Sequence, residues 1–218
     1  MKIGIIGAGH IGGTLTRRLR TLGHDVSVAN SRGPQTLAAL AKETGAHAVT
    51  VADAARDKEV VIVTIPEKSI PDLPGELSSA IKRDTVVVDT GNYYPKRDGR
   101  IAAIEDGTTE SRWVAGQLGH PVIKAFNTIY AQHLMENGRP AGTPNRIALP
   151  VAGDDPKAKA VVMKLVDDLG FDPVDAGPLD ESWRQQPGTP VYGADLDRAG
   201  TKRALADAPP ERPASFRA

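Results

Sequence analysis

Residues 2–12 read KIGIIGAGHIG, and this stretch decides the fold of the chain. Its first half, residues 2–6, is an apolar run that predicts a short strand. Its second half, residues 7–12, has the spacing G-x-G-x-x-G. A helix is predicted next, because apolar residues recur along one face at Ile11, Leu15, Leu19 and Leu22. A glycine pattern between a strand and a helix predicts the βαβ unit of a dinucleotide-binding domain; the alternative is a glycine-rich turn in an ordinary α/β domain.

Each residue of this turn has a predicted role in holding the pyrophosphate of a dinucleotide. Gly7 permits the tight turn, Gly9 lets the backbone approach the pyrophosphate, and Gly12 allows the helix to pack closely on the strand. His10 and Ile11 begin the helix, whose free N–H groups and positive dipole end face the phosphates. We therefore expect these five residues to bind the cofactor.

The residues after the second predicted strand, residues 25–29, indicate which dinucleotide binds. NAD-binding domains usually carry Asp or Glu here, about 20 residues after the glycine turn, to bind the ribose 2′-hydroxyl. This chain has the neutral Asn30, followed by Ser31 and Arg32. A hydroxyl donor and a guanidinium suit a 2′-phosphate, which a carboxylate would repel. The three residues therefore favour NADP over NAD, and a solvated turn is the alternative.

Composition and charge exclude several classes of protein. Lys plus Arg equals Asp plus Glu at 27 each, so no net charge attracts nucleic acid or an anionic membrane. The absence of cysteine excludes disulfides, thiol catalysis and cysteine-ligated metals, and the five histidines lack metal-ligand spacing. No apolar run reaches membrane-spanning length, and the N-terminus has the pattern of a strand rather than a signal peptide. We expect a cytoplasmic protein with no metal, no nucleic-acid partner and no membrane partner.

Strands and helices alternate along the rest of the chain. This alternation predicts an α/β protein with a Rossmann-type, doubly wound parallel sheet and a small C-terminal subdomain. A helix is expected to begin at Asp154-Asp155-Pro156, where an acidic N-cap precedes a proline, and to end at Gly170. Further strands are expected at residues 46–51, 59–65, 85–89, 122–126, 146–152 and 171–176.

The predicted domain organisation has two parts. The NADP-binding Rossmann domain spans residues 1–177, with an irregular excursion at residues 129–145 that is rich in glycine and proline. Residues 178–218 form the small C-terminal subdomain or tail. This tail has few large apolar residues, so it must pack on the nucleotide domain or on a second subunit.

Residues just past the carboxyl ends of the predicted strands are candidates for the nicotinamide end of the site, because ligands of such sheets bind there. Ile65, Pro66, Asn127 and Thr128 are expected to form a pocket that buries one face of the nicotinamide ring. Asn92 is expected to hydrogen-bond the carboxamide or the ribose. Simple turn chemistry is the alternative for Asn92 and Asn127.

The chain resembles the NADP-dependent coenzyme F420 oxidoreductases over roughly residues 1–179. Besides the glycine turn, the resemblance rests on Thr21-Leu22-Gly23-His24, Ser31-Arg32, Thr64-Ile65-Pro66, Asn127-Thr128-Ile129, Val161-Val162-Met163 and residues 151–155 and 175–179. It implies NADP at the glycine turn and at Ser31 and Arg32, with the nicotinamide near Ile65 and Pro66. It also implies F420 or a related flavin as acceptor and a C-terminal subdomain that covers this acceptor in a homodimer. The F420 reductases of the family carry a histidine where this chain has Asn127.

No catalytic residue is assigned from the sequence, because hydride transfer needs the orientation of two rings more than acid–base catalysis. The leading hypothesis is an NADP(H)-dependent oxidoreductase that transfers hydride between NADPH and coenzyme F420 or a related flavin-type small-molecule acceptor. One alternative is an NADPH-dependent reductase of a small carbonyl or imine, for which Lys124 is the only candidate proton donor. Another is a non-catalytic NADP(H)-binding sensor.

Overall fold

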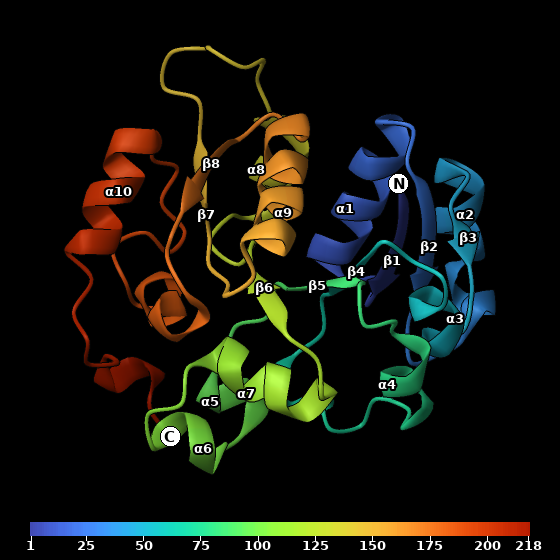
Figure 1. The fold of residues 1–218 in the computed structure, drawn as a ribbon, viewed down its shortest axis with the longest axis horizontal. Helices are drawn as coiled ribbons and strands as arrows, with labels where there is room; N and C mark the ends of the chain where they lie inside the picture. Colours follow the sequence, from blue (N-terminus) through green and yellow to red (C-terminus); the bar gives the residue numbers. More distant parts are fainter.

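The computed structural model describes residues 1–218 and contains a six-stranded parallel sheet with helices on both faces (Figure 1). The strand order is β3-β2-β1-β4-β5-β6, so the order of the strands reverses between β1 and β4. This order confirms the predicted Rossmann-type fold and places its switch point beside β1. The strands are β1 (Lys2–Ile6), β2 (Asp25–Ala29), β3 (His47–Ala48), β4 (Val60–Val63), β5 (Val86–Asp89) and β6 (Val122–Lys124).

Alternate residues of the strands enter two separate cores, one on each face of the sheet. Ile5 of β1 belongs to the first core and Ile6 to the second, and Val60 and Val61 of β4 divide in the same way. All four are apolar because both faces are covered. The first core is covered by α1 (His10–Thr21) and α9 (Pro156–Asp168), and the second by α3 (Val51–Ala55), α4 (Glu76–Ala80) and α7 (Glu110–Leu118).

The segment between β5 and β6, to which the sequence analysis assigns no element, is largely helical. Thr109 caps α7 by accepting a hydrogen bond from the Arg112 N–H at 3.3 Å, and Gly119 ends the helix with a φ of 63°. The other short helical elements are η1 (Pro34–Leu37), α2 (Ala38–Thr44), η2 (Glu67–Ser69), α5 (Pro95–Asp98) and α6 (Ala102–Glu105).

The last two predicted strands lie outside the main sheet. β7 (Ala148–Val151) and β8 (Asp172–Asp175) pair with each other in parallel and are connected by α9. α9 begins as predicted, because the Asp155 carboxylate accepts from the Lys157 N–H at 2.8 Å. An antiparallel bridge joins Ala152, just past β7, to Lys124 of β6. The chain at Ala152 therefore runs antiparallel to β6 and cannot extend the main sheet as a further parallel strand. The expectation that residues 146–152 and 171–176 continue the main sheet is wrong, because these residues form a separate small sheet.

The segment of residues 129–145, expected to be irregular, contains the helix α8 (Ala131–Glu136). The Arg18 guanidinium of α1 donates to the carbonyl oxygens of Leu134 and Met135 in α8, at 3.1 and 2.7 Å, and to that of Leu169 after α9, at 2.6 Å. A cation at the carboxyl ends of two helices satisfies carbonyl groups that have no partner within the helix. α8 and the end of α9 are therefore both held against α1.

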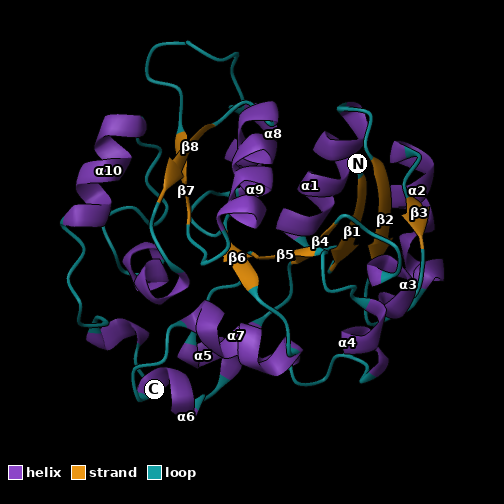
Figure 2. Cartoon of the chain, in the orientation of Figure 1, coloured by secondary structure: helices purple, strands orange, loops and turns teal.

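The C-terminal segment, residues 178–218, contains η3 (Leu179–Gln185), α10 (Arg198–Ala206) and η4 (Ala214–Phe216), and Figure 2 shows helices and loops here with no strand. α10 packs on the small sheet, and the chain then ends beside α6 (Figure 1), where the Ala218 N–H donates to the Glu105 carboxylate at 3.0 Å. No helix in the structure has the length and apolar character that crossing a membrane requires. Ala148, Val174, Val191, Ala204 and Leu205 form a third core between α10 and the small sheet.

Candidate functional site

The glycine turn joins β1 to α1 at the carboxyl edge of the sheet. Gly7 has a φ of +106°, and a Cβ there would lie 2.6 Å from the Thr64 carbonyl oxygen. A Cβ on Gly12 would lie 1.9 Å from the Gly7 carbonyl oxygen, so only glycine lets α1 start this close to β1. A Cβ on Gly9 would meet no atom within 4 Å. Gly9 therefore leaves open space at the N-terminus of α1, where a pyrophosphate can approach the backbone.

A cavity of about 660 Å³ lies between the glycine turn and the loop after β2, and we call it the Arg32 cavity. Asn30 shapes this loop, because its Oδ1 accepts from the Arg32 N–H at 3.0 Å and its Nδ2 donates to the Thr36 hydroxyl at 2.9 Å. The side chains of Ser31 and Arg32 are exposed and have no partner in the protein. Among the predicted binding residues, this cavity is lined by Gly7, Gly9, Asn30, Ser31, Arg32, Ile65 and Pro66.

A second cavity of about 730 Å³ adjoins the first, and we call it the Asn92 cavity. The two cavities share four lining residues, which are Gly9, Thr64, Ile65 and Pro66, so they form one continuous cleft. This cleft passes the switch point between β1 and β4, where ligands of doubly wound sheets bind. Among the predicted binding residues, the second cavity is lined by Gly9, His10, Ile11, Ile65, Pro66, Asn92 and Asn127.

Two of the predicted binding residues, Gly12 and Thr128, line neither cavity. Gly12 acts on the site only through the close packing of α1 on β1. Thr128 is buried, and its carbonyl oxygen accepts from the Gly193 N–H at 2.9 Å. Thr128 therefore contacts the C-terminal segment rather than the interior of the cleft.

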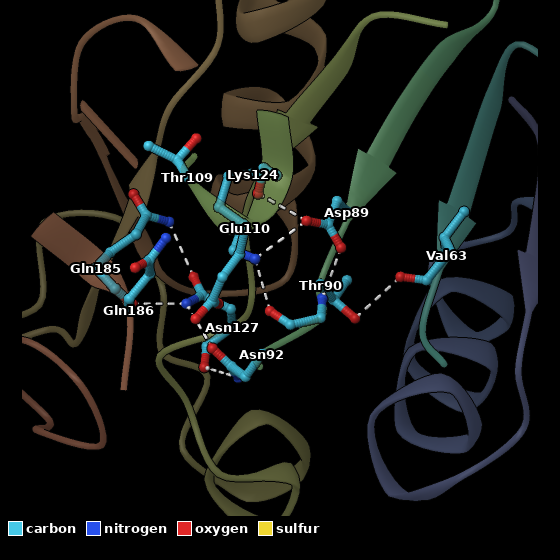
Figure 3. A network of polar contacts seen from close by, with 12 residues as sticks. Val63, Asp89, Thr90, Asn92, Thr109, Glu110, Lys124, Asn127, Gln185 and Gln186 are labelled. Carbon is cyan, nitrogen blue, oxygen red and sulfur yellow. Dashed lines mark hydrogen bonds and ion pairs between the residues drawn. The ribbon is translucent and has the colours of Figure 1, made fainter. Parts of the chain in front are cut away.

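The side-chain amide of Asn127 is linked both to the Asn92 amide and to Gln185 of the C-terminal segment (Figure 3). The Asn127 Nδ2 donates to the Asn92 Oδ1 at 3.1 Å and to the Gln185 carbonyl oxygen at 2.6 Å. The Asn127 Oδ1 accepts from the Gln185 Nε2 at 2.9 Å, and the Asn92 Nδ2 donates to the Asn127 carbonyl oxygen at 3.0 Å. Both amides are engaged within the protein, and they fix the wall of the Asn92 cavity.

Aromatic side chains make up another part of this wall. Tyr94, Tyr130 and Tyr192 line the Asn92 cavity, and the hydroxyls of Tyr94 and Tyr192 hydrogen-bond each other. Burial and this hydrogen bond raise the pKa of Tyr94, so its hydroxyl keeps its proton. Trp183 lines neither cavity and instead packs under the Arg184 guanidinium, 4.3 Å from the ring centroid. The C-terminal segment thus contributes Tyr192, and not Trp183, to the cleft.

Lys124 of β6 is fully buried and does not line the cleft. Its Nζ donates to the Asp89 carboxylate at 3.0 Å and to the Gly91 carbonyl oxygen at 2.6 Å (Figure 3). Burial disfavours the charged amine, but the neighbouring carboxylates, of which Asp89 is the strongest, outweigh burial and raise the pKa of Lys124. Lys124 is therefore a fixed cation that supports the loop after β5.

Two further buried acids near Lys124, Glu67 and Glu110, are missed by the sequence analysis. Burial raises the pKa of Glu110, although Lys124 and Arg212 oppose the shift, and the Arg212 guanidinium donates to its carboxylate at 2.9 Å. Burial and the charge of Asp89 raise the pKa of Glu67 well above its ordinary value. Acids beside a turn or a helix start are usually exposed, so the sequence gives no signal of this burial. No group of three or more His, Cys, Asp and Glu side chains in the structure is arranged to hold a metal ion.

Comparisons with known proteins agree with this geometry. The sequence profile of the family described as "NADP oxidoreductase coenzyme F420-dependent" matches residues 2–93. The crystal structure of SMa0349 from Sinorhizobium meliloti is 32% identical, with a TM-score of 0.76, over 90% of this chain and 95% of that protein. A candidate F420-dependent NADP reductase from Arthrobacter sp. FB24 is 27% identical, with a TM-score of 0.71, over 84% of this chain and 87% of that protein. The chain belongs to the family of coenzyme F420-dependent NADP oxidoreductases.

A curated relative matches this member of the family over a shorter stretch. The protein YjhV of Escherichia coli (strain K12) is 53% identical over 69 residues, which is 32% of this chain. The match spans half of the length of YjhV. Family membership places the chain among the NADP-dependent oxidoreductases, and the part of the chain that the profile matches contains the glycine turn, Ser31, Arg32 and Pro66.

Proposed function

We propose that the protein is an NADP(H)-dependent oxidoreductase that transfers hydride between NADPH and coenzyme F420 or a related flavin-type acceptor. The observation that carries the proposal is the exposed, unpartnered pair Ser31 and Arg32 at one end of a continuous cleft, with Asn30 where NAD-binding domains carry an acid. A guanidinium and a hydroxyl in this position suit the 2′-phosphate that distinguishes NADP from NAD.

The residues of the cleft fit the parts of the coenzyme in order. Ser31 and Arg32 would hold the 2′-phosphate, and the open backbone at Gly9 with the first turn of α1 would hold the pyrophosphate. Ile65 and Pro66 lie where the two cavities join and would cover one face of the nicotinamide.

The bound coenzyme supplies the hydride, and the protein has to orient it and exclude water. The amide network of Asn92, Asn127 and Gln185 holds the wall of the Asn92 cavity in one conformation, which reduces the reorganisation that binding requires.

The wall of the Asn92 cavity favours a flat aromatic acceptor. Tyr94, Tyr130 and Tyr192 line this cavity, and their aromatic rings can stack on a flavin-type ring system. Lys124 offers no support for the carbonyl or imine alternative, because its amine is buried and bound to Asp89 and Gly91. A homodimer remains part of the proposal, and sedimentation velocity measures it directly.

The test is a comparison of acceptors. The purified protein with NADPH is offered F420, FMN, ferric chelates and a panel of small carbonyls and imines, and oxidation of NADPH is followed by its absorbance. The proposal predicts turnover with F420 or FMN. Turnover confined to carbonyls or imines would replace the proposed acceptor, and tight coenzyme binding without any turnover would support a sensor.

A further inference from the structure

A cluster of charged residues lies beside the Asn92 cavity, and we call it the acidic cluster. Its members Glu67, Asp89, Glu110 and Lys124 are buried, and its fifth member, Arg212, is partly exposed. Asp89 pairs with Lys124 at 3.0 Å, and Glu110 pairs with Arg212 at 2.9 Å. Glu67 is the one carboxyl group of the cluster without a cation. Neither of its oxygens has a hydrogen-bond partner in the protein.

Glu67 lies directly against the wall of the cleft. It follows Pro66, which lines both cavities, and its Oε1 lies 2.5 Å from the position of a Cβ built on Gly91. Gly91 in turn lines the Asn92 cavity. The carboxyl group, although fully buried, therefore sits behind a part of the wall that carries no side chain.

The other charges around Glu67 leave it no positive partner. Asp89 is paired with Lys124, and Glu110 is paired with Arg212. On α5 the Arg97 guanidinium is paired with the Asp98 carboxylate at 2.8 Å. A buried carboxyl in such surroundings keeps its proton, because the ionised form would be neither hydrated nor paired. The charged side chains that face Glu67 are Asp89 on β5, Arg97 and Asp98 on α5, Glu110 on α7 and Lys124 on β6.

We propose that Glu67 holds or releases a proton according to the charge of the nicotinamide ring in the Asn92 cavity. Its carboxyl stays neutral when NADPH is bound and loses its proton when NADP⁺ is bound. The O–H bond of Glu67 breaks, the proton passes to water or buffer, and no electron enters or leaves the protein. This inference rests on the proposed function, because it requires the nicotinamide to lie against Pro66 and Gly91.

The physical reason is the difference in charge between the two coenzymes. The nicotinamide ring is uncharged in NADPH and carries one positive charge in NADP⁺. An opposite charge within about 4–6 Å favours the ionised form of a carboxyl group. Glu67 would thus release its proton to water or buffer once NADPH has given up its hydride.

Calorimetry in two buffers of different protonation enthalpy measures the proton directly, without turnover. We expect NADP⁺ binding to release about one proton more than NADPH binding wherever free Glu67 is protonated. The affinity for NADP⁺ relative to NADPH should then rise about tenfold per pH unit. Both coenzymes carry the same phosphates, so the protons of the phosphates cancel in the difference.

Two variants locate the proton. Glu67→Gln, which keeps the shape and the neutral state, should abolish the difference in proton release between the two coenzymes. Asp207→Asn, which removes an exposed carboxyl group outside both cavities, should leave this difference unchanged. Equal proton counts for the two coenzymes in the wild type, or an unchanged difference in Glu67→Gln, would overturn this inference while the proposed function stands. Failure of both coenzymes to bind would overturn both.

A measurement on the wild type keeps the test independent of how the variant folds. The infrared difference spectrum between the NADP⁺ and NADPH complexes should lose the C=O band of a protonated carboxylic acid and gain carboxylate bands. A spectrum without this loss would overturn the inference.

Discussion

At the scale of single residues, Glu67 is a fully buried carboxyl group whose two oxygens have no hydrogen-bond partner in the protein. The roles of Gly7, Gly9 and Gly12 are predicted from a local pattern. In the structure Gly7 has a positive φ, Gly9 has open space beside it, and Gly12 packs on the Gly7 carbonyl group. The burial of Glu67 depends on β5, β6 and α7, which approach it from distant parts of the chain. No local pattern encodes such a contact.

The raised pKa of Glu67 predicts how stability depends on pH. An acid whose pKa is higher in the folded than in the unfolded state stabilises the fold below its ordinary pKa, and this contribution is lost as the pH rises through the folded-state value. Between these values the free energy of unfolding of the wild type should fall by up to about 1.4 kcal/mol per pH unit through this group. Urea unfolding of Glu67→Gln across this pH range should show a smaller decrease in the free energy of unfolding as the pH rises. Parallel curves for the two proteins would show that Glu67 is ionised in the fold.

At the scale of elements, the regular parts of the fold were predictable and the irregular parts were not. β1, α1, β2 and α9 follow from apolar runs, helical spacing and caps, and they occur where expected. The separate sheet of β7 and β8 was not predictable, because a strand has the same sequence pattern whichever sheet it joins. α7 does have a signal in the sequence, which consists of its Thr109 cap and its apolar residues Val114 and Leu118.

Neighbouring glycines at the start of α1 provide a matched test of how this helix packs on β1. Gly12→Ala places a Cβ 1.9 Å from the Gly7 carbonyl oxygen, so we expect a loss of roughly 1–3 kcal/mol in the free energy of unfolding. In Gly13→Ala the Cβ would lie 3.2 Å from the end of the flexible Arg17 side chain and 3.9 Å from the Ala8 carbonyl oxygen, so this variant should be neutral or stabilise the helix by up to about 1 kcal/mol. Urea unfolding measures both. Equal effects of the two variants would contradict the packing role of Gly12.

At the scale of the whole molecule, the C-terminal segment is joined to the cleft through polar contacts. Gln185 binds the Asn127 amide, Tyr192 binds the Tyr94 hydroxyl, and Arg212 binds the buried Glu110. The low apolar content of this segment predicts that it packs on the rest of the protein. The partners of each contact are far apart in sequence, so only the structure identifies them.

Arg212 tests whether this attachment matters for stability. Arg212→Ala leaves Glu110 buried without its cation, and breaking a buried pair in this way costs about 3–5 kcal/mol. The double variant Arg212→Met with Glu110→Gln removes both charges and should recover most of this loss. Chemical denaturation measures both variants. If Arg212→Ala is as stable as the wild type, the attachment of the C-terminal segment does not depend on the Arg212–Glu110 pair.

The most direct test of the account is the affinity of the protein for NADPH and NADH, measured by calorimetry on the wild type and on Arg32→Ala. The wild type should bind NADPH more tightly than NADH. Loss of one charge-assisted contact with the 2′-phosphate in Arg32→Ala should weaken NADPH binding roughly 10- to 100-fold and leave NADH binding nearly unchanged. Arg203→Ala, which removes an exposed arginine of α10, serves as the control and should bind both coenzymes like the wild type. Equal losses for both coenzymes in Arg32→Ala, or no binding of NADPH to the wild type, would contradict the account.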